Sequence, residues 1–166
     1  MSSYNDISKS KPITEVIKLI EANVYLQISR VDVAIPYMVG APGGGKTASI
    51  KAMCTKNNWE LLSTHFALKP LEETGGIPQF NKIVVNGEEQ LGTVWSFPDI
   101  FGKLYELASK SNLVVWNLDD SHLLGPVHQA QMYELLTERS LRGYHLPDNV
   151  GKKFVHLCLM YWTKKV

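Results

Sequence analysis

The apolar residues near the N-terminus recur every three or four positions, which predicts an amphipathic helix over residues 12–26. Residues 31–39 then form a nearly continuous apolar run of strand length, which is typical of a strand buried on both faces. Pro36 lies inside this run and cannot donate a ladder hydrogen bond, so we expect the strand to be unpaired or bulged there. The pattern predicts a helix and then a buried strand that stops at Gly40.

The alternation of helical and strand-like segments continues to the C-terminus. Further helices are predicted over residues 47–57, 97–109 and 126–139, and further strands over residues 59–66, 112–118 and 154–162. An Asn-Gly pair at residues 86–87 predicts a small hairpin over residues 82–93. Strands that alternate with helices of this length favour an α/β fold, with a mainly parallel sheet flanked by helices. We predict a polar leader over residues 1–11 and a single domain over residues 12–166.

The composition narrows the class of protein further. The chain has 166 residues, 45% of them hydrophobic and 20% charged, which suits one globular domain with a buried core. A formal net charge of +1 provides no overall field that would attract nucleic acid or an anionic membrane. Cys54 and Cys158 match no metal-ligand spacing, so we interpret them as buried thiols without a disulfide. The polar N-terminus and the short apolar runs predict a cytoplasmic protein with no membrane contact.

The stretch GAPGGGKT at residues 40–47 satisfies the phosphate-binding pattern G-x-x-x-x-G-K-[ST], between a predicted buried strand and a predicted helix. Glycines let the backbone N–H groups point inward, where they and the positive end of the helix hold phosphates. In this pattern Lys46 reaches the β- and γ-phosphates of a nucleotide, and the Thr47 hydroxyl binds Mg²⁺. The predicted nucleotide-binding residues are Gly40, Ala41, Pro42, Gly43, Gly44, Gly45, Lys46, Thr47 and Ala48.

A second acidic element follows some 70 residues later, in NLVVWNLDDSH. This apolar strand would deliver Asp119 and Asp120 to its carboxyl end, where open parallel sheets bind ligands. We predict that Asp119 is the partner of Mg²⁺, through water, and that Asp120 is the general base that polarises the attacking water. Lys46 and Asp120 are therefore the predicted catalytic residues. The alternative is that the Asp-Asp-Ser sequence only caps the next helix.

With both motifs in place, the sequence resembles an AAA+ ATPase, and most closely the MoxR-type branch, which includes related ATPases of bacteriophages. The resemblance runs from about residue 33 to residue 150. Two further stretches carry it. LKPLEETGGIPQF is similar to a turn that this branch places after its second strand, and PVHQAQMYELLTERSLRGYHLPDN is similar to its helix after the acidic strand.

The resemblance implies a fold, a cofactor and partners. It implies a three-layer P-loop NTPase core with a mainly parallel sheet, a small β-hairpin insertion, ATP and Mg²⁺ as cofactors, and hydrolysis of ATP to ADP and phosphate. Family members assemble into rings, usually hexamers, that remodel a protein or nucleic-acid partner. By the same resemblance, the chain would lie in the cytoplasm of a bacterium or of a phage-infected host.

The sequence departs from the family pattern near its C-terminal end. Thr163 is the candidate sensor residue, because it is the polar group at the end of the last predicted strand. Arg139 and Arg142 are the candidate arginine fingers, although they come earlier than the finger of the family. The sequence stops at Val166, so we expect no helical lid domain. The expected hydrolysis is therefore slow.

The same residues leave two other functions open. Without a finger and a lid, the chain could be an interaction module that binds a nucleotide and does not turn it over. The P-loop also resembles the start of small nucleotide kinases, but those enzymes hold phosphates with several arginines and this chain has only Arg30, Arg139 and Arg142. Steady phosphate release and the product formed distinguish the three functions. No motif in the sequence identifies the protein or nucleic acid on which the chain would act.

Overall fold

Four parallel strands form the central sheet of the structure, a computed structural model that describes residues 11–28, 35–111, 113–147 and, by its backbone, 154–161. The strand order is β1-β8-β5-β2. The strands are β1 (Tyr37–Val39), β2 (Glu60–His65), β5 (Leu113–Asp119) and β8 (Phe154–Tyr161). Because all four strands run in the same direction, the carboxyl ends of β2 and β5 lie side by side at one end of the sheet.

Strand β5 lies inside the sheet, between β8 and β2, and all seven of its residues are buried. Its apolar run is explained by this position, because helices cover both faces of the sheet there. Val115 packs with the helices on one face, and Val114 and Trp116 pack with those on the other. The alternation of side chains along a strand produces this division.

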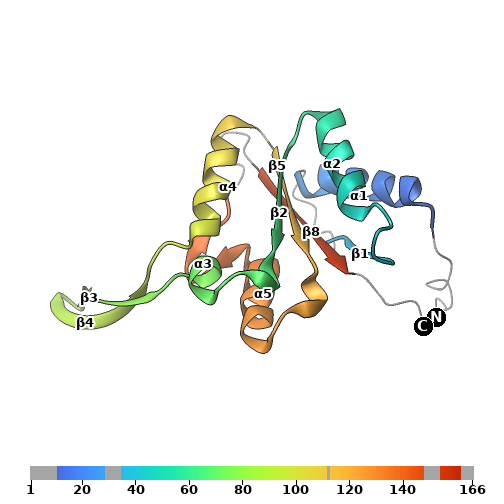
Figure 1. The fold of residues 1–166 in the computed structure, drawn as a ribbon. Coiled ribbons are helices and arrows are strands. Elements are labelled where there is room, and N and C mark those ends of the chain that lie inside the picture. Colours follow the sequence, from blue (N-terminus) through green and yellow to red (C-terminus); the bar gives the residue numbers. More distant parts are fainter. Residues whose placement is uncertain (1–10, 29–34, 112, 148–153, 162–166) are drawn as a thin grey trace, which may run out of the picture.

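Helices lie on both sides of the sheet, as Figure 1 shows. The helices α1 (Ile13–Ile28) and α2 (Lys46–Asn57) pack together on one face, where Ile20, Ile50 and Met53 form a buried cluster. The helices α4 (Asp99–Lys110) and α5 (Pro126–Glu138) cover the other face. These four helices confirm the helical periodicity of the sequence.

The larger core cluster surrounds Trp116, whose side chain is completely buried. Its indole Nε1–H donates a hydrogen bond to Thr64 Oγ1 at 3.0 Å, which satisfies the one polar atom of the ring. The ring of Phe101 meets it edge-on, with centroids 6.3 Å apart. Tyr105, which the helical pattern would also place inward, is exposed instead, and its hydroxyl donates to the carbonyl of His145.

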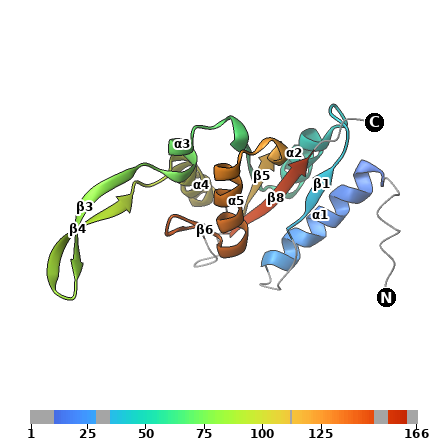
Figure 2. The ribbon, with the colours of Figure 1, turned by 90° about the horizontal axis from the view of Figure 1, so that it is seen from below.

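A long two-stranded arm leaves the body of the molecule between β2 and α4. Its strands are β3 (Pro78–Val85) and β4 (Glu88–Trp95), and Figures 1 and 2 show it projecting away from the sheet. Asn86 and Gly87 form its turn with φ of 53° and 86°, as the Asn-Gly signal predicts. The arm is longer than the predicted hairpin, because its pairing continues to Pro78 and Trp95.

Several short elements complete the fold. They are the 3₁₀ turns Phe66–Leu68 and Ser121–Leu123, the short helix α3 (Leu71–Gly75), and the hairpin of β6 (Ser140–Leu141) and β7 (Tyr144–His145). Two contacts lie at the base of the arm. The Tyr144 hydroxyl donates to the carbonyl of Trp95 at 2.7 Å. Gly76, which has φ of 76° and ψ of 179°, brings the chain against Ser96. Only glycine adopts this backbone conformation readily.

The first strand is shorter than the sequence predicts, and the expectation for the cysteines is confirmed at Cys54. Strand β1 begins at Tyr37, after Pro36, because a residue without an N–H group is a poor member of a sheet ladder. The expected strand residues 31–34 lie outside the described residues. Cys54 is buried in the α1–α2 cluster, as predicted, whereas the side chain of Cys158 lies outside the described part. Within the described residues, no helix is both long enough and apolar enough to cross a membrane.

Replacing Gly76 by alanine should lower the free energy of unfolding. A β-carbon at this position would lie 2.1 Å from the backbone oxygen of Ser96, and the positive φ adds strain of about 1–2 kcal/mol. Gly143→Ala is the matched control, since Gly143 has φ of 83° and a β-carbon there would meet nothing within 4 Å. Urea unfolding should give a loss at Gly76 larger by about 2 kcal/mol than the loss at Gly143. Equal losses would contradict the close approach.

Burial raises the pKa of the Cys54 thiol to about 12, with a smaller contribution from the Glu60 carboxylate. The folded protein therefore keeps this proton while the unfolded chain loses it near pH 9, so the free energy of unfolding should fall as the pH rises from about 9 towards 12. At pH 8, iodoacetamide should alkylate Cys54 roughly a thousandfold more slowly in the folded protein than in urea. Peptide mapping reads Cys54 separately from Cys158, and equal rates in both states would refute its burial.

Candidate functional site

The phosphate-binding stretch of residues 40–47, called the P-loop, connects β1 to α2. It lies at the end of the sheet where β2 and β5 also finish. Gly43 and Gly45 have φ of 72° and 77°, a left-handed conformation that a residue with a β-carbon adopts at a cost. The N–H of Gly44 donates to the carbonyl of Ala41 at 3.3 Å, which closes the loop into a tight turn. Gly45 directly precedes the first turn of α2, so the loop meets the positive end of that helix.

Lys46 folds back over its own loop. Its ammonium Nζ donates to the carbonyl oxygens of Gly40 at 2.9 Å and of Ala41 at 2.8 Å. Both partners are neutral, so the positive charge of Lys46 is not matched by a carboxylate in these contacts. The ammonium group is held beside the loop, and it can exchange these two hydrogen bonds for stronger, charge-assisted bonds to an anion.

Thr47 joins the P-loop to the acidic strand. Its hydroxyl Oγ1 donates to Asp119 Oδ2 at 3.1 Å across a separation of 72 residues in the sequence. The other oxygen of Asp119 accepts the N–H of Asp120 at 3.0 Å. The side chain of Asp119 is therefore fixed by two donors, and the residue is only 7% exposed. The two motifs identified separately in the sequence form one site in the structure.

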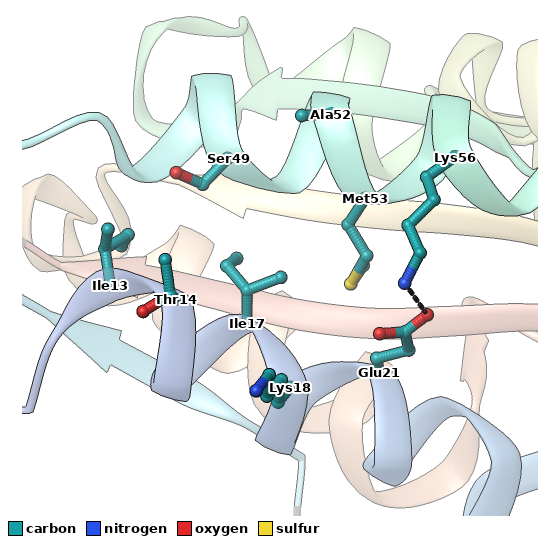
Figure 3. A pocket seen from close by; sticks show the side chains of 9 residues that line it. All are labelled: Ile13, Thr14, Ile17, Lys18, Glu21, Ser49, Ala52, Met53 and Lys56. Carbon is teal, nitrogen blue, oxygen red and sulfur yellow. Dashed lines mark hydrogen bonds and ion pairs between the residues drawn. The ribbon is translucent and has the colours of Figure 1, made fainter.

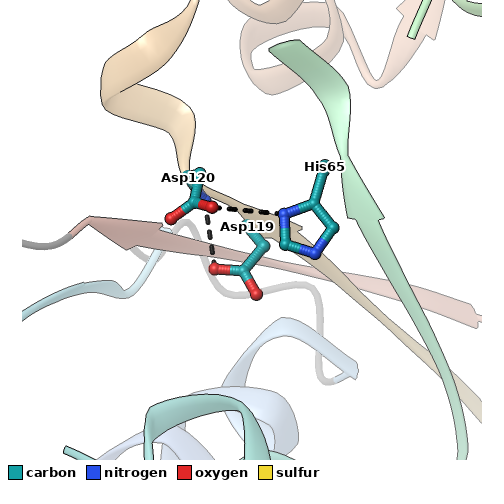
Figure 4. A group of neighbouring side chains, drawn as sticks. All are labelled: His65, Asp119 and Asp120. Carbon is teal, nitrogen blue, oxygen red and sulfur yellow. Dashed lines mark hydrogen bonds and ion pairs between the residues drawn. The ribbon is translucent and has the colours of Figure 1, made fainter. Parts of the chain in front are cut away.

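Asp120 turns out of the strand towards β2. Its φ of 52° is left-handed, and its side chain makes no capping hydrogen bond to the 3₁₀ turn that begins at Ser121, so the helix-cap interpretation does not account for it. Asp120 Oδ2 instead accepts from His65 Nδ1 at 3.2 Å, and Figure 4 shows the imidazole and both carboxylates facing one another.

His65 was not predicted from the sequence as a site residue. It is the last residue of β2, and the parallel register pairs it with Asp119. Sequence alone places it at the end of a strand, but only the register shows which residue lies beside it. Knowing that β2 borders β5 would have identified it.

Asn117, two residues before Asp119 on β5, pairs with Ser63 of β2 in the same register. The Asn117 side chain is completely buried, and its Nδ2 donates to Ser63 Oγ at 3.1 Å. Its oxygen Oδ1 is buried without a hydrogen-bond partner in the described part of the chain. Because side chains alternate along a strand, Asn117 and Asp119 point to the same face, so a polar row lies beneath the carboxylates.

A mostly apolar groove of about 320 Å³ runs between α1 and α2, behind the P-loop. Figure 3 shows Ile13, Thr14 and Ser49 at one end of the groove and the ion pair of Lys56 with Glu21 at the other. Ser49 Oγ lies 3.9 Å from where a β-carbon on Gly45 would be, so this end borders the loop.

The candidate arginine fingers lie away from the cluster of His65, Asp119 and Asp120. The candidate sensor lies outside the described residues. Arg142 has its Cζ 4.0 Å from the centroid of the Trp95 ring, at the base of the arm, and its N–H donates to Glu134 Oε1. Arg139 comes directly after α5, with φ of 51°. Thr163 lies outside the described residues, the last of which is Tyr161 in β8.

Comparisons with known proteins add little to this geometry. No model of a protein family matches the sequence, and no curated protein matches it either. A solved structure of NtrX from Brucella abortus is similar, with 15% identity and a TM-score of 0.43, over 92% of this chain and 33% of that chain. NtrX from the same organism in complex with ATP gives 11% identity and a TM-score of 0.47, over 96% and 31%.

This chain therefore spans about a third of the length of NtrX. The identities and TM-scores are low, and the likeness assigns neither a site nor an activity here.

The contact of Thr47 with Asp119 should stabilise the protein even without a ligand. Thr47→Val removes the hydroxyl with little change in shape and leaves one oxygen of a buried carboxylate without its donor. We expect the free energy of unfolding in urea to fall by about 1–2 kcal/mol. Thr55→Val is the control, because the Thr55 hydroxyl bonds only the carbonyl one turn earlier on the exposed side of α2. No difference between the variants would show that the contact contributes nothing.

Proposed function

We propose that this chain is a P-loop ATPase core that binds ATP with Mg²⁺ and hydrolyses it slowly. The observation that carries the proposal is the hydrogen bond between Thr47 and Asp119, because it joins the end of the P-loop to the acidic strand. A glycine loop of chance composition would have no reason to meet the only adjacent pair of aspartates in the chain. This meeting is what magnesium-dependent phosphate chemistry requires.

The residues of this site are chemically suited to both ATP and Mg²⁺. The loop N–H groups of residues 43–45 and the start of α2 suit the phosphates, and Lys46 would leave two neutral carbonyls to reach them. The Thr47 hydroxyl and the Asp119 carboxylate are hard oxygen donors at the expected place for the ion. When bound, Mg²⁺ neutralises charge on the phosphate oxygens.

Asp120 is the residue we assign to the attacking water. His65 occupies one of its carboxylate oxygens, and no side chain of the described residues donates a hydrogen bond to the other. That second oxygen can accept a proton from a water directed at the γ-phosphate, as a general base does. Removing this carboxylate should stop turnover while nucleotide still binds.

At a finer level, we propose an AAA+ domain of the MoxR-like type with a three-layer core. The support is the order of the motifs along the chain and the placement of LKPLEETGGIPQF at the root of the arm. On this proposal the chain assembles into a ring, with hexamers expected, and uses ATP to remodel a protein or nucleic-acid client. Arg139 or Arg142 would act as a finger towards a neighbouring subunit, and Thr163 as a sensor.

Lys46→Ala tests nucleotide binding by calorimetric titration of ATP in the presence of Mg²⁺. We expect the dissociation constant to rise at least about tenfold, equivalent to about 1.4 kcal/mol, because the ammonium that holds the phosphates is lost. Lys51→Ala is the matched control, since Lys51 is an exposed lysine on the same helix, about one turn further on. An equal effect of the two changes, or no binding by the unmodified chain, would refute the proposal.

Asp120→Asn separates hydrolysis from binding. We expect phosphate release to fall about a hundredfold or more, while the dissociation constant of ATP changes little, because the amide cannot take the proton of water. Binding without phosphate release in the unmodified chain would instead indicate a nucleotide-binding interaction module. Phosphate transferred to a second nucleotide would indicate a kinase.

A further inference from the structure

Three side chains of metal-ligand type converge at the end of the sheet. His65, Asp119 and Asp120 each offer one ligand atom, and these atoms all lie within 4.8 Å of one another. Two ligands on opposite sides of one divalent ion are about 4.2 Å apart, since each bond is about 2.1 Å long. The side chains therefore need only small rotations to share an ion.

The rigid backbone holds the three residues in this position. His65 and Asp119 are register partners on the neighbouring strands β2 and β5. Asp119 is almost completely buried and is fixed by Thr47 and by the N–H of Asp120. Asp120 adopts a left-handed backbone that directs its carboxylate towards His65.

The charges of this cluster are not balanced by other protein groups. Within the described part of the chain, no lysine or arginine forms an ion pair with Asp119 or Asp120, and the ammonium of Lys46 is bonded to loop carbonyls. The one cationic-type partner of this pair among those residues is His65, whose side chain is half exposed to solvent. Two adjacent carboxylates whose negative charge is opposed only by one imidazole form a site that attracts a cation.

The buried polar row beneath the carboxylates is an independent observation. Asn117 Oδ1 is completely buried and has no hydrogen-bond partner among the described residues. It belongs to the strand face that carries Asp119, two residues earlier. A buried amide oxygen is costly to leave unpaired, so this face of the strand has room for a donor such as a bound water.

We propose that His65, Asp119 and Asp120 bind a divalent transition-metal ion, Mn²⁺ or Co²⁺, without any nucleotide. An imidazole nitrogen suits these ions better than it suits Mg²⁺, which is bound almost entirely by oxygen. His65 would coordinate through the Nδ1 lone pair with its proton on Nε2, replacing its present bond to Asp120. This inference goes beyond the proposed function, because it adds a nitrogen ligand and needs neither ATP nor the P-loop lysine.

Calorimetric titration of the nucleotide-free full chain with MnCl₂, CoCl₂ and MgCl₂ tests the site. The chain should bind Mn²⁺ and Co²⁺ more tightly than Mg²⁺, and His65→Ala should weaken Mn²⁺ and Co²⁺ at least about tenfold. Binding of Mg²⁺ should change much less in the same variant. His145→Ala is the matched control, because His145 is an exposed histidine of β7 and should leave all three ions unaffected. Asp119→Asn should weaken all three.

Electron spin-echo modulation of the Mn²⁺-loaded chain provides a direct readout of the ligand. Coupling to one nitrogen should be present in the unmodified chain and in His145→Ala, and absent in His65→Ala. Lack of binding by the nucleotide-free chain, equal affinities in His65→Ala, or no nitrogen coupling would each overturn the proposal. The titration contains no nucleotide, so its failure leaves the proposed ATP site standing, and failure of the Lys46→Ala experiment leaves this metal site standing.

Discussion

The burial of strand β5 on both faces is the constraint on which the rest of the structure depends. Helices cover it from either side, so every residue of the strand up to its last must be apolar or internally paired. Asp119 meets this condition through Thr47 and the N–H of Asp120, whereas Asn117 meets it only at Nδ2, which donates to Ser63, and not at its buried Oδ1. The first carboxylate of the site is therefore placed by the same packing that forms the core. The candidate site therefore rests on a strand whose seven residues are all buried.

Much of the fold could be predicted because its local signals agree with its tertiary structure. The P-loop combines a fixed spacing with an apolar strand before it and a helix after it, and the arm has the Asn-Gly pair at its turn. The expected contact of the two motifs followed from the direction of parallel strands. The hairpin of β6 and β7 was missed because its strands have two residues each, too few for any periodicity.

The remaining differences arise where the neighbour of a residue decides its role. His65 has no sequence signal, since its meaning comes from the strand register that pairs it with Asp119. Tyr105 follows the apolar spacing of α4 and is nevertheless exposed; its ring packs beside Phe97, and its hydroxyl donates to the carbonyl of His145. The arm exceeds its predicted length because β-pairing continues without an apolar pattern to mark it. An isolated hairpin is marginal in water, so the contacts at Trp95 are needed to hold it.

The contacts of Lys46 with Gly40 and Ala41 make the P-loop a ligand for its own lysine. If the loop binds phosphates as proposed, an entering anion would have to compete for Lys46 with these carbonyls, whose local concentration does not fall when the solution is diluted. A weakly charged anion gains little by displacing two good hydrogen bonds, whereas a polyphosphate replaces them with stronger, charge-assisted ones. On the proposed function, the folded-back lysine would act as a threshold that favours polyphosphates over small anions at the loop, before any residue of the acidic strand is involved.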